Sequence, residues 1–124
     1  SITIQACDKR VLMPNSDFMV HYGSLFVGGS CNEVFDSIEQ SKLSNKRMLE
    51  IYASRCINGP FFKEKGYDKK KIMSYLTERM NVKTDWWITP EQAVDYGFVD
   101  GIFGTPGFES IEKIRKTKRN RRSI

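Results

Sequence analysis

Long apolar runs, a signal-peptide pattern and paired histidines are all missing from this 124-residue sequence. No stretch of eighteen or more apolar residues occurs, and the N-terminus shows no basic region followed by an apolar one. We therefore expect neither a membrane span nor a secretion signal, and a soluble, cytoplasmic protein. The hydrophobic content of 40% is enough for one modest core, which corresponds to one domain or a piece of one.

Cysteine and histidine are scarce. The three cysteines, Cys7, Cys31 and Cys56, share no C-x-x-C spacing, which favours buried reduced thiols over a disulfide framework or a zinc site. His21 is the only histidine, so metal sites that need two histidines are excluded. No glycine-rich phosphate-binding pattern occurs either. The sequence therefore predicts no metal and no cofactor.

The net charge of +5 comes from the C-terminus. Seven of the 20 basic residues lie in the last twelve positions, and residues 1–112 carry 13 basic and 15 acidic side chains. Such a run is usually a solvated tail and less often an arm for phosphate or for an acidic protein surface. Because the run carries no aromatic side chain to stack on bases, we interpret residues 109–124 as a basic tail and expect no nucleic-acid partner.

Capping patterns predict three helices. Ser30 and Glu33 form a capping box, so a long helix is expected from Ser30 to the break at residues 58–60. Asp68 caps a second helix after a linker over residues 61–66, and Thr89-Pro90-Glu91-Gln92 opens a short third helix that ends at Gly97. The apolar faces comprise Val34, Phe35, Ile38, Met48, Leu49 and Tyr52 of the first helix and Ile72, Met73, Leu76 and Met80 of the second.

The middle of the first helix, residues 39–47, is largely polar, so we expect it to project from the body and to serve subunit contact. Extended stretches are expected over residues 9–13 and 18–21, separated by a turn, and over residues 98–103. His21 ends the second stretch. Taken alone, a single histidine in this position is more often structural than a general base, and its neighbours do not decide between the two.

Two segments resemble the proteolytic subunit of the Clp protease. Residues 9–16, K-R-V-L-M-P-N-S, and residues 18–21, F-M-V-H, are similar to that family's K-R-x-x-x-P-N-S-x-x-M-I-H segment. Residues 84–100, T-D-W-W-I-T-P-E-Q-A-V-D-Y-G-F-V-D, are similar to its R-D-x-F-x-S-A-x-E-A-x-E-Y-G-L-I-D block. The two segments match in order and lie near the two ends of the chain that precedes the basic tail. The chain is thus identified as a member of this family.

The resemblance implies a catalytic role for two residues. His21 would be the general base of a serine endopeptidase, and Asp85 would orient it. The nucleophilic serine would precede this chain, because residues 1–6 resemble the helix that follows the serine in the family. Ser1 is a weaker candidate, since it lacks the preceding strand and turn that present a nucleophile, and Ser16 and Ser24 rank below it. This piece alone is expected to be inactive.

The resemblance also implies a fold and partners. The fold would be α/β, a Clp-peptidase and crotonase-like spiral of strand-helix units. Residues 1–108 would form its C-terminal part, with the first helix as a handle. A homo-oligomeric ring, peptide or unfolded polypeptide substrates and an AAA+ unfoldase ATPase are implied as partners. Peptide contact by strand addition would involve the segment that takes the place of the family's extended arm, Leu25, Phe26 and Val27.

Residues 57–67 lengthen the separation between His21 and Asp85 beyond what is usual in the bacterial subunit, which indicates an elaborated handle region. Three other functions stay open at this point. They are a catalytically inactive assembly subunit of the same family, a crotonase-type acyl-CoA enzyme and, on the basic tail alone, a nucleic-acid-binding module.

Overall fold

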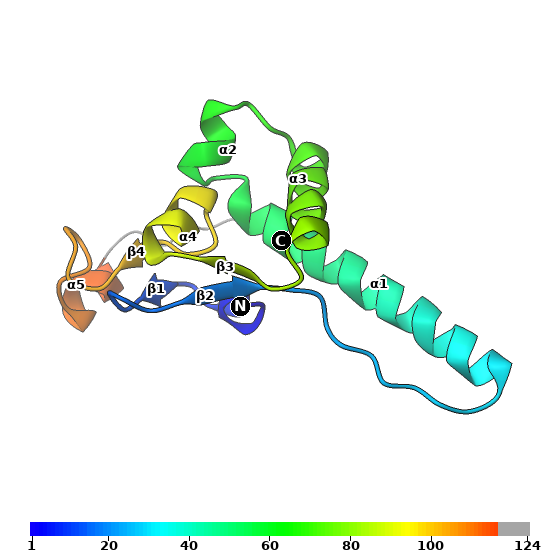
Figure 1. Ribbon diagram of the computed structural model, residues 1–124. Helices are drawn as coiled ribbons and strands as arrows, with labels where there is room; N and C mark the ends of the chain where they lie inside the picture. Colours follow the sequence, from blue (N-terminus) through cyan, green and yellow to red (C-terminus); the bar gives the residue numbers. More distant parts are fainter. Residues whose placement is uncertain (117–124) are drawn as a thin grey trace.

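The computed structural model describes residues 1–116, which form a mixed α/β structure of short strands and longer helices (Figure 1). The predicted α/β class is therefore confirmed at this level. In chain order the elements are η1 (Thr3–Ala6, a 3-10 helix), β1 (Val11–Leu12), β2 (Phe18–Val20), α1 (Cys31–Cys56), α2 (Pro60–Glu64), α3 (Lys69–Val82), β3 (Trp86–Ile88), α4 (Pro90–Tyr96), β4 (Gly101–Ile102) and α5 (Ile111–Lys116).

The strands form two separate pairs in this part of the chain. β1 runs parallel to β4, and β2 runs antiparallel to β3. Each pair joins a strand near the N-terminus to a strand about seventy or more residues later in the chain. The helices between them therefore have to fold back before either pair can form. The predicted final strand over residues 98–103 was too long. The amide of Phe98 donates to the carbonyl of Ala93 at 2.9 Å, which folds the chain back onto the end of α4 before β4 begins.

The capping box predicted for the first helix is confirmed. The amide of Ser30 donates to Glu33 Oε2 at 2.7 Å, and the amide of Glu33 donates to Ser30 Oγ at 3.4 Å. α1 then runs 26 residues, and its N-terminal half extends away from the rest of the molecule (Figure 1). Of its predicted apolar face, only Leu49 and Tyr52 are buried, while Phe35 is 65% exposed, because no other element covers the projecting half. No helix of residues 1–116 is long and apolar enough to cross a membrane.

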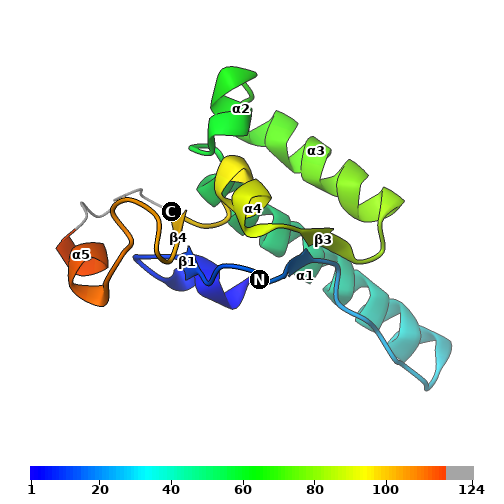
Figure 2. The same ribbon diagram turned by 60° about the vertical axis from the view of Figure 1, so that its left-hand side comes forward.

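The predicted linker over residues 61–66 instead contains α2, which begins with Pro60 at its first position. Asp68 then caps α3 as expected, accepting a hydrogen bond from the amide of Lys71 at 2.8 Å. α3 packs across the C-terminal half of α1 (Figure 2). The core between the helices and the β2–β3 pair consists of Phe18, Val20, Leu49, Tyr52, Ala53, Cys56, Phe62, Ile72, Leu76, Met80, Trp86, Ile88, Ala93, Phe98 and Val99.

The backbone after the end of α1 packs directly against the backbone at the end of α4, because both segments have a glycine there, Gly59 and Gly97. Gly97 ends α4 in the left-handed conformation, with φ of 87°, as predicted. A Cβ atom added to Gly59 would lie 2.4 Å from the backbone carbon and oxygen of Tyr96. Any larger residue at position 59 would therefore push α4 away from α1 and α2.

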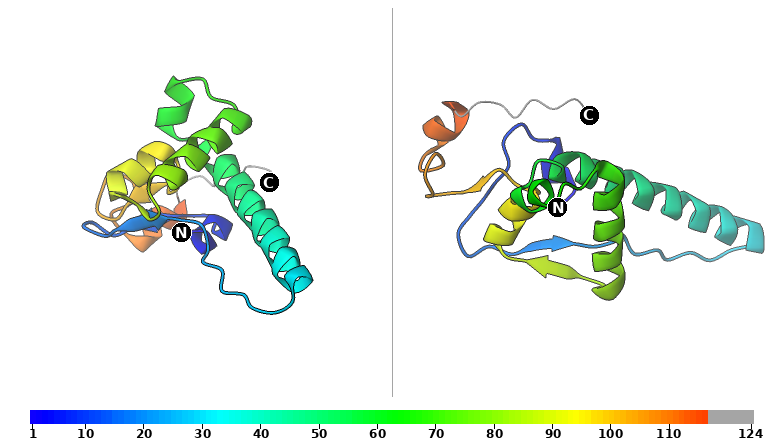
Figure 3. Two further views of the ribbon diagram at one scale, coloured as in Figure 1. Left: turned by 45° about the vertical axis from the view of Figure 1, so that its right-hand side comes forward. Right: turned by 90° about the horizontal axis from the view of Figure 1, so that it is seen from above.

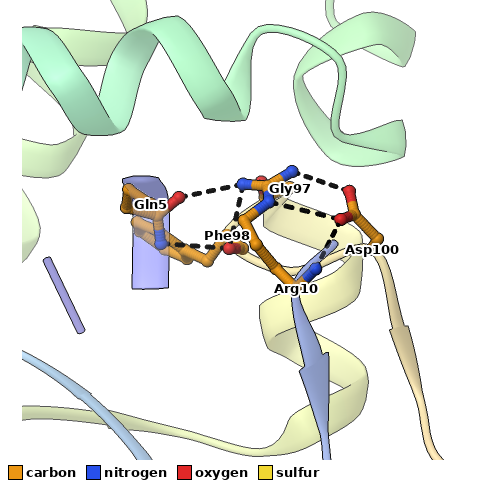
Figure 4. Close-up of polar contacts among 5 residues, drawn as sticks. All are labelled: Gln5, Arg10, Gly97, Phe98 and Asp100. Carbon is orange, nitrogen blue, oxygen red and sulfur yellow. Dashed lines mark hydrogen bonds and ion pairs between the residues drawn. The ribbon is translucent and has the colours of Figure 1, made fainter. Parts of the chain in front are cut away.

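A buried polar network joins the start of the chain to its last strand (Figure 4). Arg10 Nη2 donates to Asp100 Oδ1 at 2.8 Å, and Arg10 Nη1 donates to Gln5 Oε1 and to the carbonyl oxygens of Gly97 and Phe98. Both charged side chains are largely buried, at 7% and 15% exposure. The network places the start of β1 beside the start of β4.

The cysteines differ from the sequence prediction. Only Cys56 is buried, whereas Cys7 and Cys31 are exposed, and all three are free thiols. Cys31 is the first residue of the projecting half of α1, and Cys7 follows η1 at the surface. Burial raises the pKa of the Cys56 thiol well above its ordinary value, and the nearby Arg10 opposes this only in part. Spacing along the sequence carries no information about these surroundings.

Replacing Arg10 tests the buried network. In Arg10→Met the carboxylate of Asp100 stays buried without its cation, so we expect the free energy of unfolding to fall by about 3–5 kcal/mol. Urea denaturation followed by circular dichroism measures the change. The matched control is Lys42→Met, which breaks the exposed pair with Glu39 and should change little. Equal effects of the two substitutions would contradict the role given to Arg10.

Thiol titration tests the burial of the cysteines. An aromatic disulfide reagent releases one aromatic thiolate for each cysteine that it modifies. Near neutral pH, Cys7 and Cys31 of the native chain should react quickly and give two equivalents, and Cys56 should give a third only in denaturant. The Cys56→Ala variant should give two equivalents under both conditions. Rapid release of three equivalents from the native chain would show that Cys56 is accessible.

Candidate active site

β2 and β3 lie side by side (Figure 3), and the predicted catalytic residues directly flank one end of this pair. Phe18 pairs with Ile88, Met19 with Trp87 and Val20 with Trp86. The first and last of these pairs are buried, while Met19 is half-buried and Trp87 is exposed. One face of the pair therefore closes the core, and the other face is turned outward.

His21 follows β2 directly and Asp85 precedes β3 directly. The pairing ends at Val20 and Trp86, and Asp85 lies in a bend, so His21 and Asp85 are the two residues that flank the last pair of the ladder, one on each strand. The two positions are 64 residues apart in the sequence and come to the same end of the pair because of this register. His21 is half-buried and Asp85 is exposed.

The imidazole of His21 is hydrogen-bonded to the backbone of the next residue, Tyr22. Its Nδ1 lies 2.6 Å from the carbonyl oxygen of Tyr22. A carbonyl oxygen only accepts, so Nδ1 carries a proton and, in the neutral ring, Nε2 is the basic nitrogen. Within residues 1–116 no hydrogen bond joins the side chains of His21 and Asp85. The structure thus brings the two residues to one end of the pair without a direct contact between them.

An open groove of about 560 Å³ runs along the outward face beside His21. Its wall on the strand side comes from the outward face of the β2–β3 pair, and its opposite wall comes from η1 and the residues around it. Asp85 does not line it. The lining residues are Ser1, Thr3, Ile4, Cys7, Asp17, Phe18, Met19, His21 and Trp87.

Ser1 lies in the same groove as His21, but its hydroxyl group is engaged elsewhere. Ser1 Oγ and the hydroxyl of Tyr52 are 2.7 Å apart and share a hydrogen bond. Burial raises the pKa of Tyr52, and the bond to Ser1 lowers it by a smaller amount. The weaker alternative Ser16 is also occupied, because its hydroxyl donates to the carbonyl of Met13 at 2.7 Å.

The predicted peptide-contact residues lie on an extended segment between His21 and α1, which carries no regular secondary structure and runs out to the tip of α1 (Figures 1 and 3). Leu25, Phe26 and Val27 are all exposed there, and Phe26 reaches 97%. They do not line the groove beside His21. Their backbone is nonetheless free of the β2–β3 pair, so its N–H and C=O groups are available for strand pairing.

Sequence reasoning missed Trp87 as a groove residue. Alternation along β3 could have indicated it. Successive side chains of a strand face opposite sides, so if Trp86 and Ile88 face the core, Trp87 between them faces outward. Choosing which of the two tryptophans faces outward needed the register with β2. Within residues 1–116 no three histidine, cysteine, aspartate or glutamate side chains form a group that could hold a metal ion.

Comparison with known proteins agrees with the motifs at both ends of the chain. A family model described as Clp protease matches residues 3–106. The chain is 27% identical over 121 residues to the ATP-dependent Clp protease proteolytic subunit 1 of Streptomyces avermitilis, which covers 98% of this chain and 46% of that protein. It is 32% identical over 94 residues to the subunit 1 of Bacillus cereus, covering 76% of this chain and 41% of that protein.

A third relative, the ATP-dependent Clp protease proteolytic subunit of Paracoccus denitrificans, is 24% identical over 95 residues, which is 77% of this chain and 40% of that protein. The chain therefore spans less than half the length of the curated relatives it matches.

The opposite orientations of the two tryptophans can be tested by fluorescence. Trp87 is 59% exposed and Trp86 is 7% exposed. Trp86→Phe should leave red-shifted emission that iodide quenches strongly, and Trp87→Phe should leave blue-shifted emission that iodide quenches several-fold less. Equal quenching of the two variants would show that the assigned register of β2 and β3 is wrong.

Proposed function

Because the chain belongs to the Clp protease family, we propose that it is the part of a serine peptidase subunit that supplies the general base, His21, and the acid that orients it, Asp85. The reaction is hydrolysis of peptide bonds by acyl transfer. The nucleophilic serine belongs to the part of the protein that precedes residue 1. The relatives are named as proteolytic subunits, which supports a peptidase role for the whole protein.

The register of β2 and β3 carries this proposal. It brings the only histidine of the sequence and Asp85 to the same end of an antiparallel pair. A carboxylate that reaches the imidazole can accept a hydrogen bond from Nδ1–H and leave Nε2 free for a hydroxyl group. The groove beside His21 is open at the surface, so a peptide chain has access to the imidazole.

In the proposed reaction His21 first takes a proton from the serine and then gives it to the leaving group. The serine oxygen attacks the scissile carbonyl carbon while His21 Nε2 takes the hydroxyl proton, and the protonated imidazole then gives this proton to the leaving amine. Water attacks the acyl-enzyme in the same manner, which releases the acid product and restores the serine. The carboxylate of Asp85 stabilises the imidazolium formed in both steps.

One contact must change for this chemistry. Nδ1 of His21 now donates to the carbonyl of Tyr22, so the imidazole has to turn or the Asp85 segment has to approach before the carboxylate can accept a hydrogen bond from Nδ1–H. The tautomer needed for catalysis is the one that the Tyr22 contact already favours.

The same observation favours a second candidate, a catalytically inactive subunit that serves assembly. In such a subunit the imidazole of His21 stays on the Tyr22 carbonyl and Asp85 stays in solvent. Because the crotonase-type alternative rests on the fold class alone, no contact of this chain favours it.

We propose a homo-oligomeric ring in which the projecting half of α1 meets another copy. Exposed apolar side chains on this half support this, namely Phe35 and Leu43. The complete fold is proposed to be the crotonase-like spiral, with residues 109–124 as a basic tail; residues 117–124 lie outside the described residues. Unfolded polypeptides are the proposed substrates, contacted in part by Leu25, Phe26 and Val27 through strand addition. An AAA+ unfoldase partner and a cytoplasmic location stay predictions.

Substitution of the two residues in the full-length protein tests the proposed function. His21→Ala and Asp85→Asn should each lower kcat for hydrolysis of a short fluorogenic peptide by about 10²–10⁴-fold, because both remove base catalysis. The expected change in KM is small, since neither side chain is proposed to bind the peptide.

Asp95→Asn is the matched control for Asp85→Asn, because it removes an exposed carboxylate from α4 ten positions away. It should leave the rate unchanged. Full activity in His21→Ala would refute the assignment of the base. An inactive wild-type protein that still forms rings would support the assembly subunit instead.

A further inference from the structure

Five lysines gather where α2 meets the start of α3, at a corner of the molecule remote from the β2–β3 pair (Figure 2). We call this the lysine corner, and it consists of Lys63, Lys65, Lys69, Lys70 and Lys71. All five are exposed. They lie within nine consecutive residues, which also contain two acidic side chains.

The lysine corner has the opposite charge to the rest of the body. Residues 63–71 carry five basic and two acidic side chains, and the remainder of residues 1–112 carries eight basic and thirteen acidic ones. A positive surface on an otherwise negative body gives the molecule a directed field. The seven basic side chains beyond residue 112 are not included in these counts.

No carboxylate in residues 1–116 forms a salt bridge with the lysine corner. Other surface lysines do find partners: Lys42 pairs with Glu39 at 3.6 Å, and Lys113 pairs with Glu109 at 3.1 Å. Within the corner, Lys65 lies 5.0 Å from the ring centre of Phe61. The corner therefore keeps a net charge of +3, from five lysines and the two carboxylates of Glu64 and Asp68, and no salt bridge of residues 1–116 engages the lysines.

A groove of about 600 Å³ adjoins the lysines on the α3 side. Lys70 and Lys71 line it, together with Tyr67, Ser74 and Tyr75. Both tyrosines are half-buried, and the hydroxyl of Tyr75 is 3.2 Å from that of Tyr96. The groove thus offers cations beside two partly exposed aromatic residues.

We propose that the lysine corner and this groove dock an acidic peptide segment of a partner protein. Carboxylates of the segment pair with the lysines, and its apolar or aromatic side chains lie on Tyr67 and Tyr75. The groove favours a peptide over nucleic acid, because Asp68 and Glu78 also line it. A phosphate backbone has an evenly repeated charge that cannot avoid these carboxylates, whereas a peptide can place neutral residues there.

Fluorescence anisotropy with the full-length protein tests the proposal. The probe is a labelled peptide of alternating glutamate and aspartate with two phenylalanines. We expect saturable binding that weakens as salt is raised, since the lysines are exposed to screening. The variant Lys69→Gln/Lys70→Gln/Lys71→Gln should bind at least about tenfold more weakly, because it removes three of the five cations.

Lys113→Gln/Arg115→Gln/Lys116→Gln is the matched control. It removes the same charge from exposed positions on α5 and should leave peptide affinity unchanged within about twofold. Lysines in the first turn of α3 lie at the positive end of the helix dipole, so glutamine there should not lower Tm. Loss of binding at an unchanged or higher Tm is thus distinguished from unfolding.

Three results would overturn the proposal. The first is absence of peptide binding by the wild-type protein at low salt. The second is equal weakening of peptide binding by the two triple variants, which would show that affinity depends on the net charge of the protein and not on the lysine corner. The third is tighter, corner-dependent binding of a single-stranded oligonucleotide of equal charge, which would assign the corner to nucleic acid. None of these depends on peptidase activity.

Discussion

The antiparallel register of β2 and β3 is the constraint on which the candidate site depends. Three residue pairs define it, and the inward pairs, Phe18 with Ile88 and Val20 with Trp86, are held by burial in the core. A slip of one strand by one residue would turn its buried side chains to the outward face, so the hydrophobic core selects one register. The same register then brings the residue after β2 and the residue before β3 to the same end of the pair.

The register can hold only if the surrounding elements keep the two strands in place. The Arg10 network fixes the N-terminal segment to the end of α4 and to β4, and the close approach of Gly59 to the Tyr96 backbone seats α4 against α1 and α2. These contacts join segments some forty to ninety residues apart. Residues far from the groove therefore position it, and the polar members are buried where solvent cannot replace a lost partner.

The surface divides into regions of different physical character. The projecting half of α1 and the segment before it expose apolar side chains that no other part of residues 1–116 covers, which suits contact with another polypeptide. The lysine corner instead concentrates charge and leaves it without salt bridges. The two regions lie at different ends of the molecule, so one subunit has room for an assembly contact and a separate electrostatic one (Figure 2).

Local chemistry is what the sequence determined by itself. The caps at Ser30, Asp68 and Thr89 and the left-handed Gly97 were predictable because each depends on neighbours within four residues. His21 and Asp85 were found through family motifs, and their roles stay predictions. Only the tertiary structure decided that α2 forms in the expected linker, that Cys7 and Cys31 are exposed, and that Trp87 rather than Trp86 faces the groove. These outcomes depend on which distant segments pack together, and burial by residues far along the chain leaves no periodic signal in the local sequence.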